Sequence, residues 1–203
     1  ILYAIGSIGD KKESKYVMGF LKDPVRSIKL SAITVLGQLK YKAATPELLK
    51  LLVDEKYESY QGTIIEALMR IDDRDAIVEP LATLAKETGD KWVLMYCAAA
   101  LAYYKYDAVR PTLEKRLQKF GVGGLVFDVL AYLYGDTAKG NELYNKLRDV
   151  KLPRAAGSMT DIILRAFELK GEEGKKYMES LVKEAKSSYV SYSAKSYLER
   201  EDW

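Results

Sequence analysis

The groups of this chain that come nearest to a chemical site are its adjacent carboxylates. Asp72 and Asp73 are followed by Asp75, and Glu172 and Glu173 form a second pair. A calcium site needs alternating oxygen ligands in a longer loop than either group offers. Each group stands where a turn meets the start of an expected helix, and acidic residues there favour the helix N-terminus. We therefore interpret both groups as helix-capping acids and predict no metal.

The residues needed for common catalysis are missing from the sequence. The chain has no histidine and one cysteine, Cys97. Without histidine, His-based acid–base catalysis, the usual Ser or Cys triads and the common His-containing zinc sites are excluded. Cys97 lies in the apolar run VLMYCAAALAYY, which predicts a buried thiol rather than a reactive one. We expect no catalytic residue and no cofactor, and hence a protein that is not an enzyme.

Tyrosines and basic residues point to recognition instead. The chain has 16 tyrosines, with clusters at 103–106, 132–134 and 189–197. Tyrosine either packs a helix face with its hydroxyl in water or contributes to a protein interface. The densest basic set is either a solvated helix face or a surface that attracts an acidic partner. That set is Lys105, Arg110, Lys115, Arg116 and Lys119.

The distribution of charge argues against a nucleic-acid groove. The net charge is +3 overall, but it is +4 over residues 1–54 and −4 over residues 55–89. It is +2 over residues 90–150 and +1 over residues 151–203. A groove that binds phosphates should be consistently basic. Nucleic-acid binding is therefore kept only as an alternative function.

The elements that must position these residues are helices, because a two-helix unit recurs about every 32 residues. Ile5-Gly6 matches Leu36-Gly37, then Leu68-Met69 and then Leu101-Ala102. The small residue in this pair predicts a close approach of two helices, since glycine inside a helix otherwise costs about 1 kcal/mol. Such a period is typical of repeat proteins whose neighbouring units share one core. No strand-like alternation of useful length is present.

The repeat predicts one domain over residues 1–203, more regular over 1–119 and less regular over 120–203. Glycines at 121–124 and a connection at Lys151–Ser158 interrupt the second part. Asp23 is expected to cap a helix that begins at Pro24, and Pro46 and Pro111 are expected in first helical turns.

The chain begins at Ile1 without a methionine, which suggests a piece of a longer protein. An apolar stripe that includes Leu2 and Ile5 would then be exposed, so we expect self-association through the N-terminal repeat. No apolar stretch is long enough for a membrane span, and no signal peptide is visible. A cytoplasmic location is favoured, while an upstream targeting segment is left open.

The amino-acid sequence of the repeat resembles that of a known family. Asp23-Pro24-Val25-Arg26, then Ser31–Gly37, then Ala44–Leu52 resemble a HEAT repeat, closest to the short HEAT-like type first associated with phycobilisome lyases. The resemblance implies an all-α, α-α superhelix (a HEAT-like solenoid) of about six two-helix repeats plus a C-terminal helix. It also implies first helices on the convex side, second helices on the concave side, and protein–protein recognition as the usual role. No lyase active-site residue can be matched.

Helical spacing predicts which side chains of the second helices point away from the core. They form a mixed polar row that suits a wet protein interface. The sequence therefore predicts a non-enzymatic scaffold that binds a protein or peptide on the concave face. The alternatives are a nucleic-acid-binding solenoid and an accessory or regulatory domain of a larger enzyme. These side chains, together with Arg110 and Lys119 of the basic set, are the predicted contact residues. They are Tyr16, Glu47, Lys50, Thr83, Arg110, Thr112, Lys115, Lys119, Glu142, Asn145, Lys176, Glu179 and Lys183.

Overall fold

The described part of the chain is helical from end to end. A computed structural model describes residues 2–8, 11–54, 59–151 and 153–199. Its α-helices are, in chain order, α1 (Leu2–Ile8), α2 (Ser14–Gly19), α3 (Arg26–Gln38), α4 (Thr45–Val53), α5 (Gln61–Ile71), α6 (Arg74–Glu87), α7 (Lys91–Tyr103), α8 (Arg110–Lys119), α9 (Gly124–Tyr134), α10 (Thr137–Asp149), α11 (Pro153–Leu169), α12 (Glu172–Glu184) and α13 (Ser188–Leu198). Short 3₁₀ turns lie at η1 (Lys11–Glu13), η2 (Phe20–Lys22), η3 (Lys42–Ala44) and η5 (Asp107–Val109). None of these described residues forms a β-strand, so the all-α prediction is confirmed.

The chain divides into two compact units, Ile1–Leu113 and Glu114–Trp203. The boundary falls within α8, close to residue 119, where the sequence loses its regularity. None of the described helices combines the length and the apolarity that a membrane crossing requires, as predicted.

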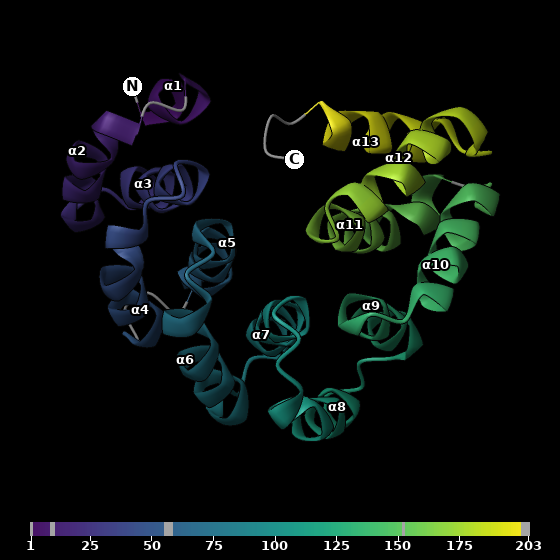
Figure 1. Cartoon of the computed structure of the whole chain (residues 1–203), viewed down its shortest axis with the longest axis horizontal. Coiled ribbons are helices and arrows are strands. Elements are labelled where there is room, and N and C mark those ends of the chain that lie inside the picture. The colour runs from purple at the N-terminus through teal and green to yellow at the C-terminus, as the bar shows by residue number, and fades with distance from the viewer. Residues whose placement is uncertain (1, 9–10, 55–58, 152, 200–203) are drawn as a thin grey trace. The chain divides into compact units, whose positions relative to one another are not determined.

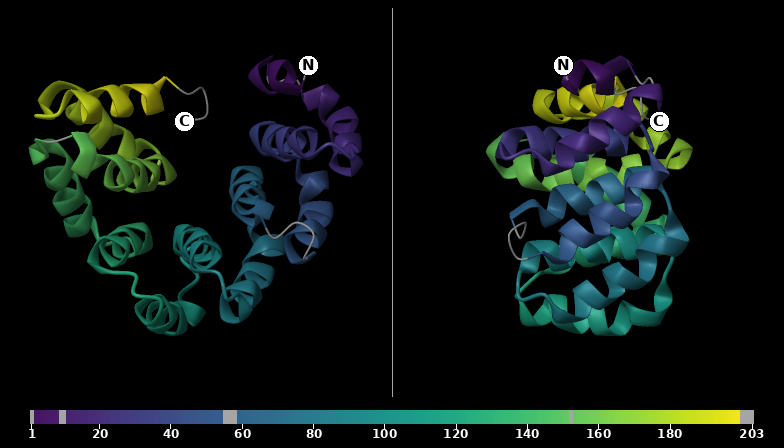
Figure 2. Two further views of the ribbon diagram at one scale, coloured as in Figure 1. Left: turned by 180° about the vertical axis from the view of Figure 1, so that it is seen from behind. Right: turned by 90° about the vertical axis from the view of Figure 1, so that its left-hand side faces the viewer.

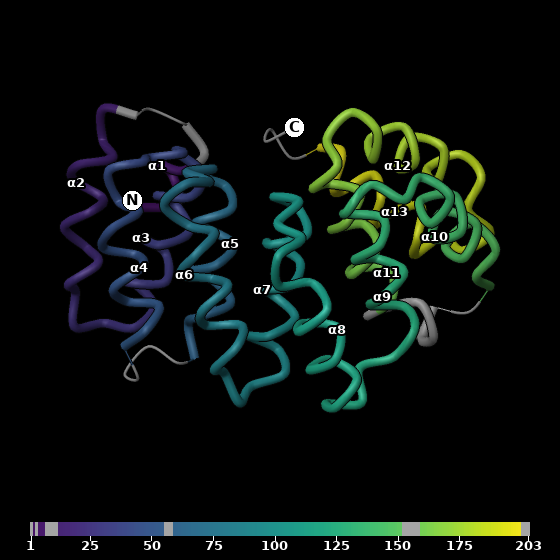
Figure 3. The backbone as a smooth tube through the Cα atoms, turned by 60° about the horizontal axis from the view of Figure 1, so that its bottom comes forward, coloured from purple at the N-terminus to yellow at the C-terminus, as the bar shows by residue number. Residues whose placement is uncertain are grey.

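The first unit consists of two layers of helices (Figure 1). One layer holds α1, α3, α5 and α7, in which each helix packs on the next, α3 on α5 most extensively. The other layer holds α2, α4 and α6, with α4 packed on α6. Figure 2 shows the two layers from behind, and Figure 3 shows the helices of this unit lying side by side. Leu36, Leu48 and Leu68 fill the space between the layers without solvent exposure, each contributing about 1.5–3 kcal/mol of burial.

Glycine allows α3 and α5 to approach closely, as the repeat predicts. A Cβ atom at Gly37 would lie 2.8 Å from Cα and 3.1 Å from Cβ of Ala67, tighter than ordinary contact. At Gly6 the atoms nearest to the added one would belong to side chains: the flexible end of Gln38 and, at 3.1 Å, Cγ2 of Val35. Close spacing shortens the layer of α3 and α5, and in Figure 1 the first unit bends towards it. The second helices α2, α4 and α6 therefore lie on the outer side of this bend, which differs from the concave placement that the resemblance implies.

A residue with left-handed backbone angles follows each of the helices α3, α5, α7, α9 and α11. At the end of α3, the N–H of Lys40 donates to the Gly37 carbonyl at 3.0 Å and the N–H of Tyr41 donates to the Leu36 carbonyl at 3.1 Å. This pair of bonds closes a Schellman-type helix end. The residues with positive φ after α3, α5, α7, α9 and α11 are Lys40, Asp72, Lys105, Gly135 and Gly171. The repeat seen in the side chains is thus also present in the backbone.

The second unit is built around aromatic contacts. Its helix α11 packs on α9, α12 and α13, and α12 also packs on α10 and α13. The ring of Phe167 meets Tyr132 edge-on at 5.7 Å and stacks on Tyr177 at 4.9 Å. A Cβ atom at Gly174 would overlap the Phe167 carbonyl oxygen, so α12 lies directly against the backbone of α11. The 132–134 tyrosine cluster therefore contributes Tyr132 to the core.

Two local predictions are wrong at helix starts. Asp23 does not cap a helix that begins at Pro24, because α3 begins at Arg26. Instead, Asp23 Oδ1 accepts the N–H of Val25 at 2.7 Å and closes a turn before the helix. The expected connection at Lys151–Ser158 is mostly helical, because α11 already begins at Pro153, a position where proline is tolerated. Pro46 and Pro111 do lie in the first turns of α4 and α8.

Candidate functional site

The predicted contact residues of α2, α4 and α6 are accessible. The Tyr16 side chain is 57% exposed, and its ring meets Phe20 edge-on at 5.0 Å. Lys50 and Thr83 are exposed and Glu47 is half-buried. Lys50 Nζ lies 3.6 Å from Glu47 Oε2, and such a surface pair contributes at most about 1 kcal/mol. A partner could therefore displace this ion pair at small cost.

Helix α8 supplies the next part of the predicted row. Thr112, Lys115 and Lys119 are exposed, and Arg110 is half-buried. Lys115 and Lys119 stand one turn apart on the same side of the helix, and both belong to the second unit. Within the described residues, neither of these two lysines has an ion-pair or hydrogen-bond partner. Both lysines are therefore open to an acidic group from outside.

The remaining predicted residues lie on α10 and α12 of the second unit. Glu142 pairs with Lys139 of its own helix at 2.8 Å, whereas the other four carry no such pair within the described residues. All five are exposed: Glu142, Asn145, Lys176, Glu179 and Lys183. The predicted contact residues thus lie on α2, α4 and α6 of the first unit, on α8, which holds the unit boundary, and on α10 and α12 of the second unit. We call these six helices, taken within each unit, the second-helix layer.

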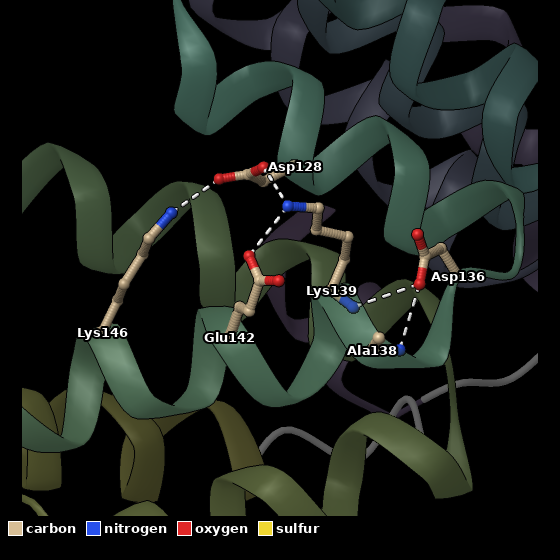
Figure 4. Close-up of polar contacts among 6 residues, drawn as sticks. All are labelled: Asp128, Asp136, Ala138, Lys139, Glu142 and Lys146. Atoms are coloured by element: carbon tan, nitrogen blue, oxygen red, sulfur yellow. Dashed lines mark hydrogen bonds and ion pairs between the residues drawn. The ribbon is translucent and has the colours of Figure 1, made fainter.

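A charge network that the sequence did not reveal links α9 to α10 (Figure 4). Asp128 of α9 accepts a hydrogen bond from Lys146 at 2.6 Å and forms an ion pair with Lys139 at 3.0 Å. Lys139 also donates to Glu142 at 2.8 Å. Asp136 caps α10 by accepting the N–H groups of Ala138 and Lys139 at 3.1 and 3.3 Å. The network fixes α10 against α9.

The network stabilises its charged state. Burial opposes ionisation of Asp128, but hydrogen bonds from Lys146 and Lys139 outweigh it and hold the pKa of Asp128 below its usual range. Hydrogen bonds to Glu142 and Asp128 raise the pKa of Lys139. Opposite charges that shift each other's pKa values in this way stabilise one another. The network is therefore interpreted as a structural contact between the two helices. The one signal in the sequence is that Asp128 is the only charged residue of the otherwise apolar helix α9.

The carboxylate groups expected to cap helices are only partly so placed. Glu172 and Glu173 lie in the first turn of α12, as predicted. Asp72 instead ends α5 in a left-handed conformation (φ 59), and Asp73 precedes α6 without a side-chain capping bond. Asp75 lies in the first turn of α6. Among the residues that the structure describes, no group of three or more acidic, cysteine or histidine side chains could hold a metal ion.

The single cysteine is inert in the folded protein. Cys97 is completely buried in α7, as predicted. Burial raises the pKa of its thiol to about 12, so the nucleophilic thiolate is almost absent near neutral pH. This thiol therefore acts as a small core side chain.

The exposed side of α7 was also missed by sequence reasoning. Trp92 is 58% exposed and Tyr96 is 39% exposed. In the sequence both residues stand in an apolar run that reads as core, because α7 is apolar around most of its circumference. Only the packing of α7 on α5 and α6 shows which side is left open.

No protein-family model matches this chain, and no curated protein matches it.

Proposed function

We propose that this chain is a non-enzymatic scaffold that binds a partner protein or peptide, and that its helices form a HEAT-like α-solenoid. The proposed contact surface is the predicted row on the second-helix layer. Two features support the solenoid assignment: successive helices form pairs, and a residue with positive φ follows each of the five helices α3, α5, α7, α9 and α11.

One observation carries the binding proposal. Of the thirteen predicted contact residues, which include Arg110 and Lys119 from the basic set, eleven are exposed and two, Glu47 and Arg110, are half-buried. The row combines lysine, glutamate, threonine, one arginine, one asparagine and one tyrosine, with no apolar aliphatic side chain. Such a surface suits a hydrated interface in which hydrogen bonds and charge pairs select the partner.

Lysines of the row provide the sharpest test. The double variant Lys50→Glu/Lys115→Glu reverses one accessible cation in each unit. Lys195→Glu is the matched control, because Lys195 lies on α13, outside the second-helix layer, and like Lys50 it is an exposed lysine in the last turn of its helix with a surface ion pair. Each variant is used to capture partners from the source cells, and the affinity of each captured partner is then measured with purified proteins.

The proposal expects the double variant to weaken binding of an authentic partner at least tenfold, with the melting temperature unchanged, whereas Lys195→Glu binds as the parent does. Equal affinity of all three proteins would contradict the proposed surface. Binding to DNA or RNA at micromolar protein that falls steeply with salt, without any protein partner, would replace the scaffold with the nucleic-acid alternative.

A further inference from the structure

The exposed side of α7 carries a line of aromatic and small residues. Trp92 and Tyr96 are 58% and 39% exposed, and Ala99 and Tyr103 are half-buried. Their spacing of four, three and four residues puts them on one side of the helix. We call these four residues the α7 stripe, which is about 16 Å long at 1.5 Å per residue. Exposed tryptophan and tyrosine in a contiguous patch are typical of binding surfaces.

The stripe is held in place by its neighbours. A Cβ atom at Gly62 would lie 2.8 Å from Cε2 of Tyr96, so the Tyr96 ring rests on the backbone of α5. The Tyr103 ring meets the ring of Tyr104, a buried residue, edge-on at 4.9 Å. Side chains that are already fixed lose little entropy when a partner covers them.

Opposite charges stand at the two ends of the stripe. At the Trp92 end, the Lys91 ammonium lies 5.0 Å from the centre of the Trp92 ring. At the Tyr103 end stands Asp72, the exposed residue that ends α5. Helix α5, which Asp72 ends, packs on α7, and burial and the Asp72 carboxylate both raise the pKa of Tyr103.

The order of residues makes the stripe complementary to itself. Reversing it about its midpoint exchanges Trp92 with Tyr103 and Tyr96 with Ala99. Two antiparallel copies would therefore set the largest side chain against an aromatic ring and Tyr96 over a small residue. The same reversal brings Lys91 of one copy towards Asp72 of the other, twice. A two-fold interface requires this kind of self-complementarity.

We infer that the α7 stripe is a homodimer interface in which the α7 helices of two copies of this chain pack antiparallel. The contact is small, since two or three aromatic side chains cover about 150–250 Å² each when buried. Interfaces of that size are weak and transient. The dimer is expected to dissociate with a constant of about 10–100 µM.

This inference does not rest on the proposed scaffold function, because the α7 stripe and the predicted row lie on different helices. It also names a different surface from the N-terminal self-association that the sequence predicts. Of the apolar residues expected there, Leu2 and Ile5 are half-buried, while Ile1 lies outside the described residues and the Ile8 side chain is likewise not described.

The test is sedimentation of the full chain from about 5 to 500 µM, a range that brackets the expected constant. Trp92→Ala should shift dimerisation to at least tenfold higher concentration, whereas Tyr192→Ala, which removes a 73% exposed tyrosine from α13, should leave it unchanged. In a Trp203→Phe background, Trp92 is the only tryptophan. Its emission should move to shorter wavelength as the concentration rises.

Charge exchange tests the antiparallel register. Lys91→Glu and Asp72→Lys should each weaken the dimer, and the double variant should restore it. Lysine is compatible with the left-handed backbone at position 72, since Lys40 and Lys105 adopt it at equivalent places. A monomer at every concentration, a Trp92→Ala variant that still dimerises, or a double variant that fails to recover would each overturn the inference. Loss of the dimer in Leu2→Ser alone would transfer it to the N-terminal repeat.

Discussion

Replacing Gly37 by alanine tests whether the close approach of α3 and α5 is a requirement of the fold. The added Cβ would lie 2.8 Å from the Ala67 backbone, and ordinary contact begins near 3.4 Å. The two helices must therefore separate by about 0.6 Å, and overpacking of this kind costs about 1–3 kcal/mol. Relief of the helix-propensity penalty of glycine returns about 1 kcal/mol. We expect a net loss of up to about 2 kcal/mol.

Gly19→Ala is the matched control for this variant. Gly19 has helical backbone angles (φ −59, ψ −33), and no neighbouring atom lies within 4 Å of an added Cβ. Alanine there should stabilise the protein by about 0.4–1 kcal/mol. Urea unfolding followed by circular dichroism gives both free energies, and the two substitutions should have opposite signs. If Gly37→Ala stabilises the protein as Gly19→Ala does, the close packing of α3 on α5 does not restrict the fold.

Three further predictions follow from local geometry. Lys40→Gly and Lys105→Gly should each raise the unfolding free energy by about 0.5–1 kcal/mol in urea titrations, because glycine adopts their left-handed backbone without strain; an unchanged or lower value would contradict the helix-end assignment. Cys97 should react with a thiol reagent only as the protein unfolds, since at pH 8 its thiolate is about a thousandfold scarcer than that of an exposed cysteine; fast labelling of the native protein would show that the thiol is accessible. The pKa of Asp128 is lowered by folding, so its stabilising effect is full above the unfolded value near pH 4 and is lost as the pH falls through the lower folded value. The stability of Asp128→Asn should accordingly fall below that of the parent at pH 7 and converge with it below about pH 4, and a constant difference across this range would argue against the Lys139–Asp128–Lys146 network.

The repeat period predicts the helical class and much of the packing, because each unit must bury the same apolar positions against its neighbours. It correctly predicts the close approach of two helices at Gly37, and the apolar run around Cys97 correctly predicts a buried thiol. The period cannot say on which side of a bend each helix lies. That depends on the spacing within each layer, which is set by contacts such as Gly37 against Ala67.

The structure adds contacts between side chains of different helices. Asp128 meets Lys139 and Lys146, and a helical pattern alone does not give the rotation of α10 against α9. The α7 stripe is hidden for another reason. Trp92 belongs to a helix that is apolar on nearly every side, so hydrophobicity cannot separate its exposed face from its buried one.

The most direct test of the scaffold proposal is photo-cross-linking to the captured partner. A benzoylphenylalanine residue is placed at Thr83 or at Asn145, exposed row positions in the first and second units. The control position is Thr34, an exposed residue of α3 outside the second-helix layer. The scaffold proposal predicts adducts of the partner at Thr83 and Asn145 and none at Thr34. Adducts at Thr34 with none at either row position would contradict it.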